Sequence, residues 1–165
     1  AKNKVGMATV NIFFESLGVI EVKTGLYIGN VIFFSADKNV TALIDQVERM
    51  MQRELGLDIP VFIIPQEELA DILRHAPDWW GTENKGNYDN LIFILPPATF
   101  PDIYYEIGAP KEGLEQIQEY QSAVFWSFSR KDYQKTNWWS KTARADIGSK
   151  LTIRTANTVR RIVDI

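Results

Sequence analysis

The sequence predicts an α+β fold, and the order of its expected strands and helices is the main reason. Residues 88–154 show, in turn, the patterns of a strand, a helix, two strands, a helix and a strand. Residues 7–64 show the same order without the first strand. Because βαββαβ is the order of a ferredoxin-like unit, we expect two such units in tandem. The first would lack its initial strand, and a short C-terminal helix would follow the second.

The first half begins with apolar residues at helical spacing over 7–17, and Gly18 suits the end of that helix. Two β-rich runs, at 20–24 and 26–34, are expected to pair as a hairpin. The other elements expected in this half are a helix from about 39 to 55, a strand over 61–64 and a short helix over 67–73.

The second half opens, after a polar loop at 77–87, with an all-apolar strand over 91–95. Such a strand should be central and buried on both faces. A hairpin of strands at 114–120 and 124–128 follows, and the polar alternation of its first strand is typical of a sheet edge. The other expected elements are a helix over 100–107, a basic helix over roughly 132–144, a strand over 151–154 and a closing helix that Thr155 can cap.

The two halves are predicted to span residues 1–76 and 77–165. In a βαββαβ unit the first strand lies inside the sheet, so its absence from the first half would leave exposed strand edges. We therefore expect an N-terminal strand to precede this chain, which begins at Ala1, or to come from another chain.

Composition limits the classes of function. The chain has no cysteine and therefore no disulfide, no thiolate nucleophile and no thiolate metal site. No apolar run approaches the roughly 20 residues that span a bilayer, and no signal-peptide pattern opens the chain. With 45% hydrophobic residues the chain can bury a core. We expect a cytoplasmic protein that does not bind membranes.

The charge distribution is uneven along the chain. Residues 130–165 carry nine lysines and arginines against three aspartates, a balance of +6, whereas the net charge of the whole chain is −3. Such polarity can indicate an anionic partner for the basic segment. The alternative is that the basic segment packs against the acidic remainder and is neutralised by it, since an acidic protein is an unusual nucleic-acid binder.

Several short motifs are spread over nearly the whole chain: 1–7, 15–18 (Glu-Ser-Leu-Gly), 29–33 (Gly-Asn-Val-Ile-Phe), Trp79-Trp80, 133–136 and 152–158. In this register they resemble a bacterial family known as domain of unknown function 1697. The resemblance implies a double ferredoxin-like fold and no established activity. In this chain Ile28 stands where the family usually has serine, and the family's initial strand and Gly-Gly turn are absent.

Isolated polar residues give weak candidates for catalysis or metal binding. His75 is the only histidine, and a catalytic role would need an orienting carboxylate and a nucleophile that no motif marks. Asp102 and Glu106 share a helix face, as surface pairs often do. Glu67, Glu68 and Asp71 have no calcium-loop spacing and are read as a solvated face. We expect no catalytic residue, metal or cofactor.

The strongest candidate is an anion-binding site in the basic segment. Arg154 ends an expected strand, and Thr155 opens a helix whose N-terminal N–H groups and dipole favour an anion. Lys135 and Lys141 are close in sequence, and Trp138 and Trp139 could stack on bases. The competing interpretation pairs Arg154 with an acid of the first half and leaves both tryptophans to packing.

These observations favour a binding module over an enzyme. We expect the basic C-terminal face to bind an anionic ligand, either a single-stranded nucleic acid or a nucleotide. One alternative is an enzyme that acts on a phosphorylated or carboxylated small molecule in the cleft between the halves. Another is an oligomerisation or protein-interaction role through strand addition at the edge strand 114–120. The sequence gives no oligomeric state.

Overall fold

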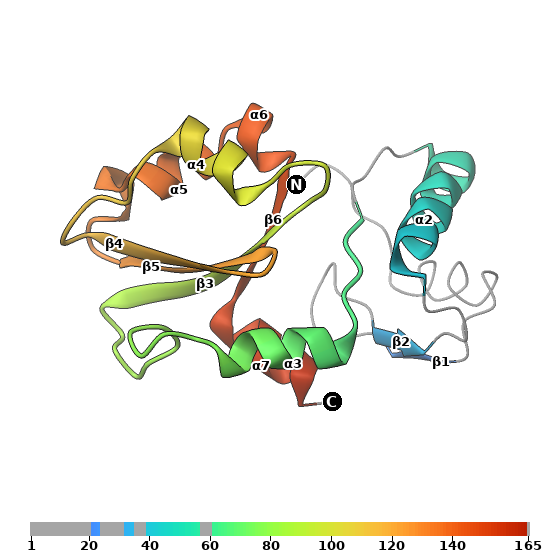
Figure 1. The fold of residues 1–165 in the computed structure, drawn as a ribbon, viewed down its shortest axis with the longest axis horizontal. Helices are drawn as coiled ribbons and strands as arrows, with labels where there is room; N and C mark the ends of the chain where they lie inside the picture. Colours follow the sequence, from blue (N-terminus) through green and yellow to red (C-terminus); the bar gives the residue numbers. More distant parts are fainter. Residues whose placement is uncertain (1–20, 24–31, 35–38, 57–60, 165) are drawn as a thin grey trace. The chain divides into compact units, whose positions relative to one another are not determined.

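The computed structural model describes residues 21–23, 32–34, 39–56 and 61–164 (Figure 1). The chain divides into two compact units, Ala1–Ile64 and Pro65–Ile165, which are called unit 1 and unit 2 below. Helices and antiparallel strands are mixed along the sequence, so the fold belongs to the α+β class as expected.

The described residues of unit 1 form a short hairpin and a long helix. Strand β1 (Glu21–Lys23) pairs antiparallel with β2 (Ile32–Phe34), which confirms the expected pairing of these runs. Helix α2 (Val40–Leu55) begins where the Asn39 side chain accepts a hydrogen bond from the Ala42 N–H at 3.1 Å. It ends at Gly56, whose φ of 64° is the left-handed conformation that glycine adopts without strain. The buried stripe of α2 consists of Leu43, Val47 and Met50.

Two expectations for unit 1 lie outside the described residues, namely the helix at 7–17 with its end at Gly18, and the strand expected to precede the chain. A third is wrong. The apolar run Val61–Ile64 belongs to neither sheet and is neither helix nor strand. A short apolar run does not by itself make a strand, because a strand also needs a neighbouring edge with which to pair.

Unit 2 contains a four-stranded antiparallel sheet in the order β4-β5-β3-β6 (Figure 1). Strand β3, which contains the apolar run at 91–94, lies between β5 and β6, and β4 lies at an edge, as the sequence predicts. From β3 to β6 the chain runs strand, helix, strand, strand, helices and strand. The bounds are β3 Asn87–Ile94, α4 Phe100–Ile107, β4 Glu115–Tyr120, β5 Ala123–Ser129, α5 Asn137–Thr142, α6 Ala145–Gly148 and β6 Leu151–Thr155.

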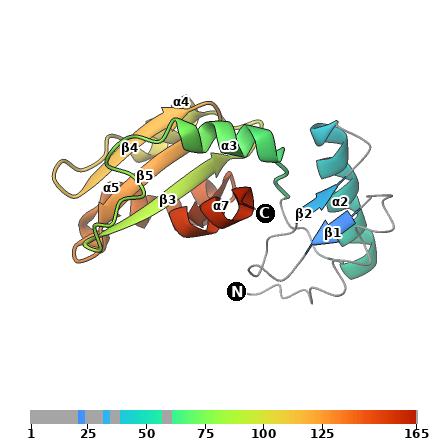
Figure 2. The same ribbon diagram turned by 90° about the horizontal axis from the view of Figure 1, so that it is seen from below.

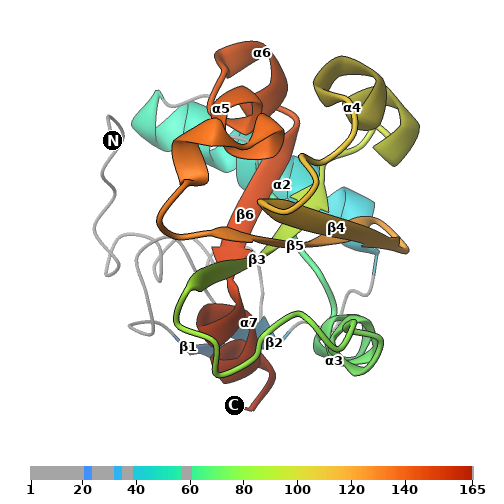
Figure 3. The same cartoon turned by 90° about the vertical axis from the view of Figure 1, so that its left-hand side faces the viewer.

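Helices cover both faces of this sheet. Figures 1 and 3 show α4, α5 and α6 on one face, which is called the α5 face below. Helices α3 (Gln66–Arg74) and α7 (Ala156–Val163) lie on the other face, where Figure 2 shows them next to each other. The Gln66 amide donates a hydrogen bond to the Val163 carbonyl at 2.8 Å and so joins the start of α3 to the end of α7.

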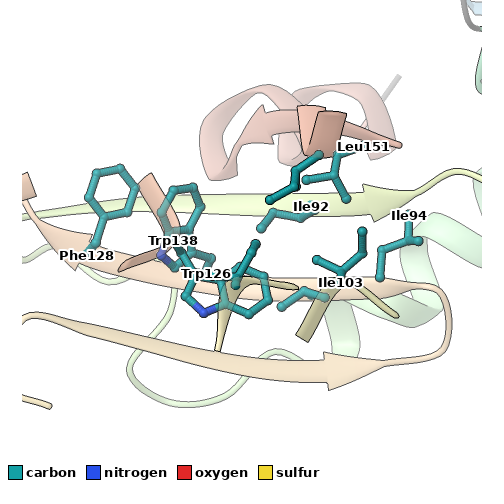
Figure 4. Packing of buried hydrophobic residues seen from close by; sticks show 10 residues of the cluster. Ile92, Ile94, Ile103, Trp126, Phe128, Trp138 and Leu151 are labelled. Atoms are coloured by element: carbon teal, nitrogen blue, oxygen red, sulfur yellow. The ribbon is translucent and has the colours of Figure 1, made fainter. Parts of the chain in front are cut away.

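The core beneath the α5 face follows from strand alternation (Figure 4). Ile92 and Ile94 of β3 point toward α4 and α5, where they join Trp126 and the fully buried Trp138. The intervening residues of β3, Leu91 and Phe93, are also buried and face α3 and α7. A strand buried on both faces reads as a continuous apolar run, and residues 91–94 of β3 do.

Residues 132–144 do not form the single basic helix that the sequence predicts. They begin with a 3₁₀ turn, η1 (Tyr133–Lys135), which is followed by α5, and α6 follows as a separate short helix. Thr136 has extended backbone angles, and its hydroxyl accepts a hydrogen bond from the Trp139 N–H at 3.3 Å. Threonine in this role starts a new helix, so the expected helix is divided at Thr136.

Along the chain, the boundary between the two compact units lies between Ile64 and Pro65, earlier than the boundary expected between residues 76 and 77. The difference is α3, which packs on α7 and therefore belongs to unit 2. The assignment of residues 1–76 and 77–165 to two ferredoxin-like halves stays a prediction.

Candidate anion-binding surface

Trp138, one of the six residues singled out from the sequence, has no exposed surface. Its indole N–H donates a hydrogen bond to the Gly108 carbonyl at 3.1 Å, and its ring stacks near Phe100 in the core. A buried indole with a satisfied N–H is a packing residue that joins α5 to the end of α4. It is not available for stacking on a ligand.

Lys141 lies at the end of α5 and is half-buried. Its ammonium group donates a hydrogen bond to the Ile107 carbonyl at 2.8 Å, at the C-terminal end of α4. A cation in this position satisfies one of the last carbonyls of the helix and interacts favourably with the helix dipole. Lys141 therefore joins two helices of the α5 face.

Arg154 and Thr155 belong to the last strand and to the helix that follows. Leu151 and Ile153 pack on the core of the α5 face, so by alternation Arg154 points to the opposite face. Its guanidinium donates to the Thr152 hydroxyl and to the Ile153 carbonyl, both at 2.9 Å, and burial lowers the pKa of Arg154. As expected, Thr155 caps α7 and accepts a hydrogen bond from the Thr158 N–H at 3.2 Å.

The six predicted residues therefore do not form one surface, because α5 and the start of α7 lie on opposite faces of the sheet (Figure 3). Two of them, Lys135 and Trp139, are exposed on the α5 face. The Lys135 ammonium pairs with the Asp132 carboxylate at 3.4 Å, and its side chain is 71% exposed. The Trp139 ring meets Tyr133 edge to face at 4.6 Å and keeps 37% of its surface exposed.

A second exposed ring lies on the same face. Tyr88 lies on the same face of β3 as Ile92, is 37% exposed, and touches the Phe128 ring, with the two ring centroids 5.2 Å apart. The Arg130 guanidinium carbon lies over the Tyr88 ring, 4.1 Å from its centroid. This is the geometry of a cation–π contact, and Arg130 is exposed, so its guanidinium can also meet solvent or a ligand.

The connection from β5 to α5 carries the cations between these rings. Its first residue is fixed, because the Arg130 N–H donates to the Gly86 carbonyl at 2.9 Å. The Asp132 N–H donates to the Ser129 hydroxyl at 3.0 Å. Lys131, which stands between Arg130 and Asp132 in the sequence, is exposed. We refer to Tyr88, Arg130, Lys131, Lys135 and Trp139 together as the aromatic–basic surface.

A buried acid holds α5 in place beside this surface. Glu115 is only 5% exposed, and its carboxylate accepts hydrogen bonds from the Lys111 and Asn137 N–H groups at 2.9 and 2.6 Å. Its other oxygen accepts from the Trp138 N–H at 3.2 Å and from the Trp126 indole at 3.3 Å. The start of α5 therefore has an internal anion where its unpaired N–H groups need an acceptor.

His75 has the carboxylate neighbour that the sequence did not mark. Its Nδ1 lies 2.8 Å from the Asp71 carbonyl and 3.7 Å from the Asp71 carboxylate, and its ring stacks on Tyr120 at 4.2 Å. The Tyr120 hydroxyl donates to the Asp71 carboxylate at 2.8 Å, which is the main cause of the lowered pKa of Asp71. The cluster joins the end of α3 to the β4–β5 hairpin.

The other acidic candidates have structural partners. Asp102 forms a capping box with Thr99, in which each side chain accepts from the other's backbone N–H. Glu106 pairs with Lys150 at 3.1 Å. Within the part of the chain that the structure describes, no three histidine or acidic side chains are grouped as metal ligands.

Sequence reasoning missed Tyr88, Arg130 and Lys131 as parts of a surface. The signal was partly present, because Arg130 and Lys131 open the basic segment. What sequence alone did not show is that Tyr88 lies opposite Phe128 in the ladder between β3 and β5, next to the start of that segment.

The sequence profile of a family described as protein of unknown function (DUF1697) matches residues 1–125, which is more than half of the chain. The chain belongs to this family. The resemblance seen in its short motifs is thereby confirmed. Membership in DUF1697 brings no activity with it, because the description of the family names none.

A solved structure supports the fold. The conserved bacterial protein SP0830 from Streptococcus pneumoniae is similar over 99% of this chain and 90% of its own length, with a TM-score of 0.84 and 22% identity. Identity this low shows likeness of fold alone. No curated protein matches the sequence. Among the described residues, no helix has the length and apolar character that crossing a membrane requires.

Proposed function

We propose that this DUF1697 protein is a binding module for an anionic ligand, a single-stranded nucleic acid or a nucleotide, and that the aromatic–basic surface of unit 2 holds it. The observation that carries the proposal is the Arg130 guanidinium on the exposed Tyr88 ring, with exposed Trp139 on the same face. Rings that stack on bases beside cations that meet phosphates are the two elements of single-strand recognition.

The cations of this surface are suited to exchange a partner. In the pair between Lys135 and Asp132 the lysine side chain is 71% exposed and the aspartate side chain 30%, and ion pairs at the protein surface contribute at most about 1 kcal/mol. A phosphate can therefore replace Asp132 at little cost. Arg130 is exposed while it contacts the Tyr88 ring, so its guanidinium can also donate to phosphate oxygens.

We also propose that the chain folds as two ferredoxin-like units in tandem. The strand order β4-β5-β3-β6, with a helix after β3 and helices after β5, supports a complete unit in Pro65–Ile165. The hairpin β1–β2 followed by α2 agrees with the middle part of a second unit. In such a pair, the basic face would belong to the C-terminal unit.

A matched pair of lysine variants tests the binding surface. We expect the full chain to bind a labelled oligothymidylate of about ten nucleotides at low salt, measured by fluorescence anisotropy. Lys135→Ala should weaken binding several-fold, because one phosphate partner is lost. Lys150→Ala removes a lysine that is also ion-paired but lies just before β6 and outside the aromatic–basic surface, and this variant should bind as the parent does.

The lysine comparison controls for net charge, since both variants lose one positive charge. Equal weakening by the two variants would mean that the attraction is general and that this surface holds no site. Absence of binding at low salt would refute the proposed function itself.

A further inference from the structure

We infer that the ligand is a single strand in which at least two bases stack on separate platforms of the aromatic–basic surface. A mononucleotide, or a polyanion without bases, would use only part of the surface. The inference rests on the proposed function and narrows its ligand from anions in general to a single-stranded oligonucleotide.

The first platform is the guanidinium of Arg130, supported from below by Tyr88. The ring and the cation are 4.1 Å apart, which is a stacking distance, and the Phe128 ring supports Tyr88 in turn. A guanidinium plane backed by a ring is a surface on which an unpaired base can stack. Because the Arg130 N–H is bonded to the Gly86 carbonyl, its backbone is held in place beside the ring.

The second platform is the indole of Trp139. Its contact with Tyr133 is nearly perpendicular, with an interplanar angle of 77°, and such a contact covers at most one face of either ring. The indole is also held through its backbone, because the Trp139 N–H donates to the Thr136 hydroxyl. A ring fixed at one side and 37% exposed can receive a base without reordering.

Both platforms lie on one face of the sheet. Phe128, which supports Tyr88, belongs to the core cluster beneath the α5 face, and Tyr133, which supports Trp139, packs against that cluster. The segment between the platforms carries the exposed Lys131 and Lys135. A strand that reaches from one platform to the other would therefore pass its phosphates over two cations.

The two-platform arrangement also selects against a duplex. Bases inside a duplex are stacked on their neighbours, so their faces are covered and cannot meet Arg130 or Trp139. The ligand that suits this surface is therefore a single strand with a flexible backbone and unpaired bases. Sequence preference is not expected, because every base offers a face for stacking.

The experiment compares ligands that differ in the number of bases. The full chain is titrated at low salt with thymidine monophosphate, with short oligothymidylates of increasing length and with inorganic polyphosphate of matched charge, measured by calorimetry. We expect the oligothymidylates to bind at least about tenfold more tightly than polyphosphate, since each stacked base contributes a factor of this order.

Aromatic variants connect the preference to the platforms. Trp139→Ala should weaken oligothymidylate binding about tenfold and leave polyphosphate binding unchanged, whereas Trp139→Phe should retain most of the affinity because a ring remains. Tyr105→Ala is the matched control, because Tyr105 is 90% exposed on α4 and is not part of the aromatic–basic surface, and it should change neither affinity.

The outcomes separate the inference from the proposed function. Equal binding of polyphosphate and oligothymidylate, or a Trp139→Ala variant with unchanged oligothymidylate affinity, would overturn the two-platform inference and leave a site for anions. If no ligand in the series binds, the proposed function fails, and the inference fails with it.

Discussion

Glu115 is a charged residue in a place where charges are rarely found. Its carboxylate is buried, yet both oxygens accept hydrogen bonds, three from backbone N–H groups and one from the Trp126 indole. A buried anion is stable only when such donors replace water. The same bonds satisfy N–H groups at the start of α5 that have no partner within the helix.

We expect Glu115→Ala to lower the free energy of unfolding by about 3 kcal/mol or more, because buried N–H groups lose their acceptor and a cavity remains. The measurement is urea unfolding followed by circular dichroism. Glu119→Ala on the same strand is the control, since Glu119 is exposed and should change stability by less than about 0.5 kcal/mol. Similar losses for both variants would contradict the role assigned to Glu115.

Asp71 gives a prediction about pH. Its hydrogen bond from Tyr120, with smaller contributions from His75 and Arg74, lowers the pKa of Asp71 below the ordinary value of 3.8. A depressed carboxyl pKa stabilises the folded state above that ordinary value, and the stabilisation is lost as pH falls through the lower folded value. The stability difference between the parent and Asp71→Asn should therefore be constant near neutral pH and shrink below pH 3.8.

Urea midpoints measured across this acidic range, for the parent and the variant side by side, give the difference directly. Other carboxylates titrate in both proteins, so only the difference reports Asp71. A difference that grows as the pH falls would show that the Tyr120 bond does not favour the ionised form.

Helix α5 is short, and its position depends on its first residues rather than on intrinsic helix propensity. Thr136 is buried, and its hydroxyl accepts from the Trp139 N–H while donating to the Tyr133 carbonyl at 2.7 Å. The hydroxyl therefore joins the 3₁₀ turn to the helix. Both elements carry a residue of the aromatic–basic surface, Lys135 and Trp139.

Removing this hydroxyl should loosen the element. We expect Thr136→Ala to cost about 1 kcal/mol of unfolding free energy, the usual cost of a lost N-cap, and Thr136→Ser to cost clearly less because the hydroxyl remains. Thermal unfolding of the two variants under one set of conditions provides the comparison. Equal stabilities would mean that the Glu115 carboxylate alone is enough to start α5.

Local signals were enough to predict some elements. Helix α4 was expected over 100–107 and has those bounds, because Thr99 caps it and Gly108 follows it. The apolar run at 91–95 was expected to form a central strand, and β3, which contains residues 91–94, is central. The prediction of a single basic helix over 132–144 was wrong, because Thr136 and the distant Glu115 start a new helix within this range. That contact joins residues far apart in sequence, which periodicity does not reveal.

The residues of the candidate site were even harder to predict from the sequence than the helices and strands. Adjacent tryptophans are expected to point in different directions, but the sequence does not say which one is exposed. The structure buries Trp138 and exposes Trp139. Similarly, Arg154 and Lys141 are near in sequence, but alternation along β6 points Arg154 to the face of the sheet opposite α5. Nearness along the chain is therefore a poor guide to which cations share a surface.

The uneven charge of the chain takes a specific form in the fold. Among the described ion pairs, Lys150 with Glu106 joins the basic segment to the acidic remainder, whereas Lys135 with Asp132 and Arg144 with Asp146 lie within the segment. Acids from the rest of the chain thus neutralise part of the positive charge of the basic segment. The cations of the aromatic–basic surface can face a ligand.

Salt dependence of binding tests this account most directly. If Arg130, Lys131 and Lys135 each neutralise a phosphate, the logarithm of the association constant for oligothymidylate should fall against the logarithm of salt concentration with a slope of about −2. Lys135→Ala should reduce the slope by about 0.7 and Lys150→Ala should leave it unchanged. A slope near zero, or the same reduction in both variants, would contradict the assignment of phosphate contacts to this surface.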